Sequence, residues 1–244
     1  MKRKRAATNG KQAEMLESEL VRKHAKLVAG IRQDHREKRK EGGGHHDLFH
    51  AIRVARTALC IAPDEETARL AWLAGILHNT DRLFGKKQTE KKLRAHLKDV
   101  RLDEAEKEKI INAVLEHDTP NNSKDGLVTI ILKDADRIAD AGAMQLMRGT
   151  QWFSGLPICL LGEPGKYSGA KFPNAKVVTD VIYWFLEWES HPKFRLRLPK
   201  AKKLAKPGFD FLRSALKDIR RQQEAIGMYP VPRAVKKIIG DYTN

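Results

Sequence analysis

Apolar residues recur at helical spacing along most of this chain, and no stretch alternates polar and apolar residues for long enough to predict a strand. An apolar face that repeats every three to four residues is typical of an amphipathic helix. The segment 48–62 shows this pattern most clearly. The segment 70–77 is apolar all round, which predicts a helix buried on every side. The sequence therefore predicts an all-α protein.

The predicted helices fall in three regions of the chain. A polar helix with a thin apolar stripe occupies about 11–40, and the run 41–44, Glu-Gly-Gly-Gly, ends it. Further helices are expected near 46–62, 65–79, 88–98, 103–117, 126–148, 177–190 and 209–226. We expect a basic N-terminal helix and linker at 1–41, a helical core at 42–190, and a basic helical C-terminal extension at 191–244.

At four places a residue that can bind a metal stands where an apolar helical stripe meets polar residues. These residues are His50 in HHDLFHAIRV, His78 in AGILHNTDR, His117 in AVLEHDTPN and Asp136 in ILKDADRI. His50 shares the apolar face of its helix with Val54, four residues later, so its imidazole is expected to point inward. His78 stands at the break that ends the buried segment 70–77. Each histidine has the alternative of a core imidazole bonded to a carbonyl.

Only one of the two neighbouring aspartates near the fourth position can face the same pocket. Asp134 and Asp136 are two residues apart, so they point about 200° apart on a helix. Asp136 follows Leu132 by four residues, on the apolar stripe, and is the expected inward carboxylate. An ionised carboxylate buried there needs a cation or a strong partner. Arg53 or Arg137 would serve as that partner if no metal binds.

Taken in order, these stretches resemble the HD superfamily of metal-dependent phosphohydrolases. The shared features are H-x-x-x-V, then a histidine followed by Asp or Asn after a buried helix, then K-x-A-D-R-[IL], over roughly residues 44–150. The resemblance implies a helical bundle that holds one divalent ion (Mn, Co, Mg, Fe or Zn). In it, His50 resembles the first ligand, His78 the doublet histidine and Asp136 the late aspartate.

The chain departs from the family pattern at Asn79, where the doublet has an aspartate. An amide oxygen can coordinate a hard cation but brings no charge, so the site is one unit less anionic and should bind a divalent ion more weakly. An amide is also poorly suited to bridging two ions, so we expect one metal or none. Asp81, three residues after His78, would be a compensating carboxylate, or it would pair with Arg82 or with solvent.

The resemblance also implies residues that act on the substrate. We expect Lys133, Arg53 and Arg82 to neutralise charge on the phosphoryl oxygens, with Asp81 as a further catalytic group. Additional candidates are His117, Asp134 and Arg137. His117 resembles an extra histidine of some family branches, and it could equally cap a helix end before the turn that follows.

The positive charge of the chain lies at its two ends. Lys and Arg outnumber Asp and Glu by 13 to 5 in residues 1–40 and by 14 to 4 in residues 191–244, whereas residues 41–190 hold 20 against 22. Basic blocks attract phosphates. We therefore expect a phosphorylated small molecule or a nucleic acid as partner, with a solvated basic face or an acidic partner as the alternative.

The remaining features predict a cytoplasmic protein without a membrane segment. Cys60 and Cys159 both lie in apolar stretches, which favours free thiols in a reducing compartment. The basic first residues precede no apolar core segment of a secretory signal, and the segment 70–77 is too short to span a bilayer. The sequence does not indicate an oligomeric state.

Two functions follow from these observations. The first is an HD-type hydrolase that acts on a phosphate ester, of a nucleotide or a nucleic acid, through a metal-activated water. The second is a module that kept the bundle, lost catalysis and binds nucleic acid or an acidic partner. Asn79 favours the module, whereas the retention of His50, His78 and Asp136 together favours the enzyme.

Overall fold

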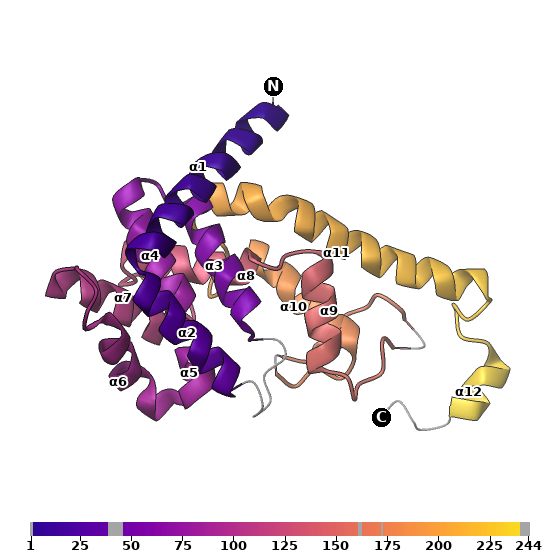
Figure 1. Cartoon of the computed structure of the whole chain (residues 1–244). Helices are drawn as coiled ribbons and strands as arrows, with labels where there is room; N and C mark the ends of the chain where they lie inside the picture. The colour runs from indigo at the N-terminus through magenta and orange to yellow at the C-terminus, as the bar shows by residue number, and fades with distance from the viewer. Residues whose placement is uncertain (1, 39–45, 161–162, 172, 240–244) are drawn as a thin grey trace. The chain divides into compact units, whose positions relative to one another are not determined.

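A computed structural model describes residues 2–38, 46–160, 163–171 and 173–239 (Figure 1). Within these ranges the regular structure is helical and contains no strand, which confirms the all-α prediction. The helices are α1 (Lys2–Lys23), α2 (Ala25–Lys38), α3 (Leu48–Ile61), α4 (Glu65–Leu77), α5 (Thr80–Phe84), α6 (Lys86–Leu97), α7 (Glu104–Glu116), α8 (Leu127–Ile138), α9 (Ala143–Trp152), α10 (Val178–Leu186), the 3-10 helix η2 (Glu187–Glu189), α11 (Pro199–Ala225) and α12 (Arg233–Ile239).

The chain forms two compact units. The first comprises Met1–Asp140 and Leu196–Leu204, and the second comprises Ala141–Arg195 and Ala205–Asn244. The segment 42–190, expected as one core, is thus divided between the two units. The run 41–44, which we expected to end the first helix, lies outside the described residues.

The core of the first unit is built from four helices. α3 packs against α4 and α8, and α7 packs against α4 and α8 (Figure 1). Their facing side chains are almost fully buried, including Val54, Trp72, Ile110 and Leu132. Burial of such side chains contributes roughly 1.5–3 kcal/mol each before conformational entropy is counted. This core fixes the three helices that carry the candidate metal ligands.

α3 and α4 approach each other closely at Gly75. A Cβ atom at this position would lie 2.6 Å from the Cα and 2.8 Å from the backbone nitrogen of Ala55. Only glycine allows the two backbones to pass at this distance. The close approach brings the end of α4, where His78 stands, beside α3.

Aspartate side chains fix where three of the core helices begin. Asp47 accepts a hydrogen bond from the backbone nitrogen of His50 at 2.7 Å, and Asp64 accepts one from Thr67 at 2.8 Å. Asp103 caps α7 in a reciprocal capping box. A side-chain cap of this kind contributes about 1 kcal/mol. The cap at Asp47 also fixes the turn of α3 on which His50 lies.

Two long helices expected from the sequence are interrupted. The helix expected at 11–40 is α1 and α2, which are separated at His24. The helix expected at 126–148 ends at Ile138, and α9 starts only after Gly142, whose φ is 107°. A Cβ at Gly142 would lie 3.3 Å from the Cα of Gly208, so backbone conformation and packing both require glycine there. By contrast α11 starts earlier than expected and continues through Pro207.

In the second unit, Asp180 anchors the loop between α9 and α10. Its buried carboxylate accepts hydrogen bonds from the backbone nitrogens of Ser168 and Lys176, both at 2.9 Å, and from Val177 at 3.2 Å. In the same unit the rings of Trp184 and Trp188 lie 5.1 Å apart, and Trp188 is buried.

Cys60 and Cys159 are free thiols, as the sequence predicts. Among the described helices, none has both the length and the apolar character needed to cross a bilayer.

Candidate metal centre

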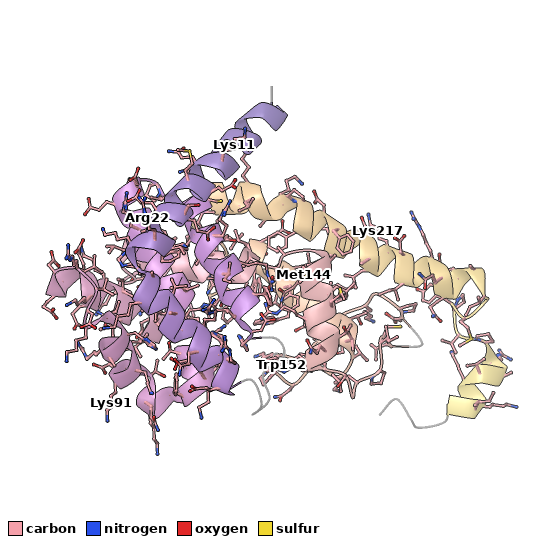
Figure 2. All side chains as sticks on the ribbon, in the orientation of Figure 1. Lys11, Arg22, Lys91, Met144, Trp152 and Lys217 are labelled. Carbon is pink, nitrogen blue, oxygen red and sulfur yellow. The ribbon has the colours of Figure 1, made fainter. Side chains whose placement is uncertain are left out.

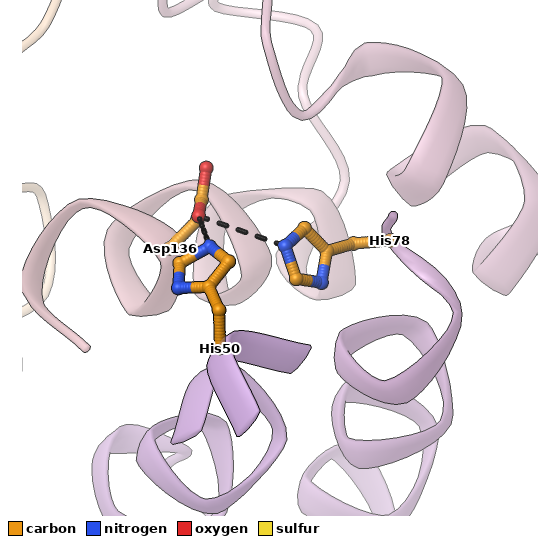
Figure 3. A group of neighbouring side chains, drawn as sticks. All are labelled: His50, His78 and Asp136. Atoms are coloured by element: carbon orange, nitrogen blue, oxygen red, sulfur yellow. Dashed lines mark hydrogen bonds and ion pairs between the residues drawn. The ribbon is translucent and has the colours of Figure 1, made fainter. Parts of the chain in front are cut away.

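Three potential metal ligands from distant parts of the chain meet in the first unit. His50 comes from α3, His78 follows the last residue of α4, and Asp136 lies on α8 (Figure 3). One Asp136 oxygen, Oδ1, is 3.0 Å from His50 Nε2 and 3.8 Å from His78 Nε2. One ligand atom from each residue lies within 4.8 Å of the other two, and no other group of this kind occurs among the described residues.

The second ring nitrogen of each histidine fixes which atom faces the centre. His78 Nδ1 is 2.7 Å from the carbonyl of Gly75, an acceptor, so Nδ1 carries the proton and Nε2 keeps its lone pair. His78 Nε2 is buried and makes no hydrogen bond within the described structure. His50 Nδ1 lies 2.8 Å from Asp140 Oδ2, which leaves Nε2 turned toward Asp136. Both imidazoles therefore present Nε2 to the centre.

The electrostatic environment favours the protonation states that bind metals. Burial lowers the pKa of His78 well below its ordinary value, and the neighbouring rings of His50 and His117 lower it further against the opposing effect of Asp136. Burial alone would raise the pKa of Asp136, but its hydrogen bond with His50 and the nearby imidazoles outweigh burial and hold this pKa well below the usual range. At neutral pH the centre thus offers a neutral imidazole and a carboxylate.

These residues fit a divalent cation. Two imidazole nitrogens and one carboxylate oxygen form a donor set that suits first-row divalent metals, with bonds of about 2.0–2.2 Å for zinc. Asn79 Oδ1 is a further buried oxygen that makes no hydrogen bond in the described part of the chain. The unsatisfied Nε2 of His78 and Oδ1 of Asn79 are the atoms that a cation would satisfy.

Asn79, which stands where the sequence resemblance has an aspartate, makes hydrogen bonds that only an amide can make. Its Nδ2 donates hydrogen bonds to the carbonyls of His46 and Asp47, both at 3.2 Å. These carbonyls belong to the segment that leads into α3. A carboxylate cannot donate, so an aspartate here would face two acceptors at close range. The amide therefore holds the segment before α3 in a way that a carboxylate at this position could not.

Asp140 is a residue that the sequence analysis missed. Its fully buried carboxylate accepts from His50 Nδ1 and pairs with Arg53 Nε, so it orients the His50 ring. A carboxylate behind a metal-binding imidazole fixes its tautomer and raises its basicity. Arg53 was expected at the phosphoryl group, and the structure ties it to Asp140 instead. Its spacing could have indicated this residue, because Asp140 follows Asp136 by four residues in the sequence.

The structure corrects the expected role of Lys133. This side chain is completely buried, and its ammonium donates to Thr119 Oγ1 at 3.1 Å, to the carbonyl of Pro120 at 3.0 Å and to Asp125 at 2.9 Å. All three donors are used by the turn between α7 and α8. Lys133 therefore holds that turn and cannot neutralise a phosphoryl group.

Asp134 and Arg137 likewise have partners away from the centre. Asp134 Oδ2 accepts from the backbone nitrogens of Arg197 and Leu198, at 2.9 and 2.8 Å, and so anchors the segment 196–204 to α8. Arg137 donates to Asn121 Oδ1 at 2.7 Å and is buried. The inward residue of the aspartate pair is Asp136, as its spacing predicts.

The remaining candidates are Asp81, Arg82 and His117. Arg82 lies 3.4 Å from Asp81 and 3.7 Å from Asp118, so Asp81 takes the alternative of pairing with Arg82 and is outside the ligand group. The Arg82 side chain is 39% exposed and remains accessible. His117 Nδ1 lies 2.6 Å from the carbonyl of Val114 at the end of α7, and its ring centroid is 5.4 Å from that of His78. His117 therefore combines a helix-end position with a place next to the centre.

Comparisons with known proteins give a family match and several similar folds. Residues 48–141 match the HD domain family. Among solved structures, the chain is similar to an HD-superfamily hydrolase from Bacillus thuringiensis, with a TM-score of 0.60 and 15% identity over 84% of this chain and 99% of that one. It is also similar to a protein from Lactobacillus plantarum, with a TM-score of 0.57 and 16% identity over 86% of this chain and 98% of that one. A third similar structure is Bacillus subtilis YpgQ in complex with ADP, with a TM-score of 0.57 and 14% identity over 84% of this chain and 96% of that one. No curated protein matches the chain.

Proposed function

This chain carries an HD domain at residues 48–141, and from that premise we propose that it is a metal-dependent phosphohydrolase acting on a nucleotide. The resemblance found in the sequence is confirmed by the family match and by the shared fold. The observation that carries the proposal is the convergence of His50, His78 and Asp136, whose ligand atoms lie within 4.8 Å of one another. A scaffold alone does not require three such groups around one point.

The residues of the centre divide into ligands and supports. His50 Nε2, His78 Nε2 and Asp136 would hold the cation, with Asn79 Oδ1 as a fourth donor. A bound divalent cation supplies Lewis acidity and lowers the pKa of a coordinated water. Asp140 holds the His50 ring in the orientation that presents Nε2. Arg82, whose side chain is accessible, would bind the phosphoryl oxygens and offset the charge that builds up on them.

Support for a nucleotide substrate comes from one of the similar structures and from the charge of the chain. Bacillus subtilis YpgQ was solved in complex with ADP. The net charge of this chain is +16, which raises the local concentration of phosphorylated molecules. In the reaction, the oxygen of water forms a bond to phosphorus, the P–O bond to the leaving group breaks, and a proton from the water ends on the leaving oxygen.

The test is turnover of a nucleotide panel by the purified chain with Mn²⁺, Co²⁺ or Mg²⁺ present. We expect release of phosphate from at least one nucleotide, and loss of that turnover on treatment with a chelator. His78→Ala should reduce turnover by more than the roughly 10–100-fold typical of residues that only support a ligand. A matched control is His96→Ala, because His96 is also part-buried and paired with a carboxylate, Asp34 at 2.8 Å, but lies outside the centre. Equal turnover in both variants would refute the proposal.

The second candidate function is a nucleic-acid-binding module, and the basic ends of the chain favour it. Lys11 on α1 and Lys217 on α11 are exposed examples of this charge (Figure 2). Under this proposal the ends contact phosphates of RNA or DNA, and the HD domain need not turn over a substrate. A metal-free, inactive protein that binds RNA would favour this candidate over the enzyme.

A further inference from the structure

The charge of the metal centre is set by a single carboxylate. Asp136 is the only acidic residue in the ligand group of the described chain, and Asn79 offers a neutral amide oxygen as the further donor. An imidazole that binds a metal is neutral. A divalent ion held by these residues would therefore leave the centre with one net positive charge, whereas an aspartate at position 79 would leave it neutral.

The hydrogen bonds of Asn79 hold its amide in one orientation. Nδ2 donates to the carbonyls of His46 and Asp47, both at 3.2 Å. Oδ1, on the opposite side of the amide, is buried and makes no hydrogen bond within the described structure. Rotation of the amide would bring its oxygen against the two carbonyls. The neutral oxygen is thus the atom that Asn79 keeps available to a cation.

The charged residues that follow or flank the ligands along the chain do not cancel this positive charge, because three ion pairs account for them. These pairs are Asp140 with Arg53, Asp134 with Arg137 at 4.0 Å, and Asp81 with Arg82 at 3.4 Å. The carboxylate of Asp47 caps the N-terminus of α3, where the helix dipole opposes its charge. The charge of the loaded centre therefore remains for a bound anion.

The ligands differ in how far solvent reaches them. His50, His78 and Asn79 are each 1% exposed, whereas the side chain of Asp136 is 28% exposed (Figure 3). A substrate therefore approaches the centre from the side of Asp136. A terminal phosphoryl group carries its organic part on one side only and can enter in this way. A phosphodiester has an organic group on two sides of the phosphorus, and both would have to fit at the same opening.

We propose that the centre selects a terminal, dianionic phosphoryl group, such as that of a nucleoside monophosphate, over a monoanionic phosphodiester, and that Asn79 determines this preference. A dianion gains twice the Coulomb attraction of a monoanion from the same positive charge, and the attraction is stronger at a poorly solvated site. This inference names the substrate class of the proposed function and rests on its metal centre.

The experiment compares two phosphonates that differ by one methyl ester and one charge. Methylphosphonate is a dianion in mildly alkaline buffer, and its monomethyl ester is a monoanion. Neither contains the P–O bond of a phosphate monoester, so binding is measured without turnover. Calorimetric titration of the full chain, loaded with one equivalent of Mn²⁺, should give about tenfold or more tighter binding of methylphosphonate.

Three variants separate the charge of residue 79 from its hydrogen bonds. Asn79→Asp adds a negative charge to the loaded centre and should reduce the preference for the dianion by about tenfold. Asn79→Ala also loses the bonds to His46 and Asp47 but adds no charge, so it should keep the preference. Asn112→Asp adds the same charge on the exposed face of α7 and should keep it as well.

Equal affinity of the wild type for the two phosphonates would overturn the inference. An unchanged preference in Asn79→Asp, or loss of the preference in Asn79→Ala, would overturn the role of Asn79. A chain that hydrolyses a nucleotide but binds both phosphonates equally refutes this inference alone. A chain that prefers the dianion but hydrolyses no nucleotide supports it and refutes the hydrolase. Failure of the chain to bind Mn²⁺ would refute both.

Discussion

Asp140 controls the orientation of His50, and the charge of its buried carboxylate is essential to that role. Its two oxygens are divided between His50 Nδ1 and Arg53 Nε. We predict that Asp140→Asn lowers the affinity for Mn²⁺ by roughly 10–100-fold, because a neutral amide makes His50 a poorer and less fixed ligand. Calorimetric titration of the metal-free protein measures this affinity.

The matched control for this substitution is Asp210→Asn, which removes a carboxylate from an exposed ion pair on α11. It should leave the Mn²⁺ affinity unchanged. If Asp140→Asn binds Mn²⁺ as tightly as the control does while remaining folded, Asp140 has no positioning role.

Asn79 contributes to stability through the two carbonyls that its amide holds. Asn79→Asp removes both donors and places a carboxylate beside the carbonyls of His46 and Asp47. We expect the free energy of unfolding of the metal-free protein to fall by about 1–3 kcal/mol. Urea denaturation followed by circular dichroism measures the change. Asn112→Asp, on the exposed face of α7, is the control and should be nearly neutral.

At the scale of residues, the sequence predicted the three side chains that converge, but not the contacts that support them. His50, His78 and Asp136 each break an apolar helical stripe, and this local signal predicted their inward orientation. Lys133 also follows such a stripe, but its partners lie in the turn 119–125. Asp140 gains its role through contact with residues 87 and 90 positions away, Arg53 and His50. Long-range partners of this kind cannot be predicted from local spacing.

Among the elements, the crossing of α3 and α4 at Gly75 determines whether the centre can form. Gly75→Ala would place a Cβ 2.6 Å from the Cα of Ala55, so the helices must separate. We predict a loss of about 1–3 kcal/mol in the free energy of unfolding, as for an overpacked core. Metal affinity should fall as well, because His50 and His78 lie on the two helices that move apart. Urea denaturation and Mn²⁺ titration provide the two measurements.

Gly30→Ala on α2 is the control for this prediction. A Cβ at Gly30 would meet only the His96 ring, with Cε1 at 3.7 Å and Nδ1 at 3.8 Å, which are ordinary contacts. Alanine has the higher helix propensity, so this variant should be as stable as the wild type or more stable by up to about 1 kcal/mol. A Gly75→Ala protein that is as stable as Gly30→Ala would contradict the close packing of α3 and α4.

The sequence predicted that most of these segments are helical. It predicted where a helix begins or ends only where a nearby residue, such as a capping aspartate, marks the position. The helices α3, α4 and α7 each begin directly after a capping aspartate, close to where the sequence predicts them to begin. The break between α8 and α9 depends on Gly142 and its packing against Gly208, 66 residues later, and the periodicity of 126–148 conceals it. Tertiary packing decided this boundary.

On the scale of the whole molecule, the two basic ends belong to different units for the most part. α1 lies in the first unit, and α11 from Ala205 onward lies in the second. Several cations of α11 are paired within the helix, such as Lys206 with Asp210 at 2.9 Å and Arg220 with Glu224 at 2.9 Å. These carboxylates are already set against the cations in the count of 14 to 4, so the excess of positive charge at this end remains. This division between units was not predictable from composition.

If the ends bind nucleic acid, the affinity must depend on salt in a defined way. Lys202 and Lys203 are exposed on α11 and take part in no ion pair within the described residues. For single-stranded RNA, each phosphate contact contributes about −0.7 to the slope of log affinity against log salt concentration. We expect Lys202→Gln/Lys203→Gln to weaken RNA binding and reduce the slope by about 1.4 in fluorescence anisotropy. The control Lys91→Gln should change neither, and an RNA affinity independent of salt would exclude this role.

The central claim is that His50, His78 and Asp136 hold one divalent ion together. Its most direct test is titration of the chelator-treated chain with Mn²⁺, with free Mn²⁺ followed by electron paramagnetic resonance. We predict one tightly bound ion per chain in the wild type and in His96→Ala, and none at the same concentrations in His78→Ala or Asp136→Asn. Undiminished uptake of Mn²⁺ by these two variants, or no uptake by the wild type, would contradict the account.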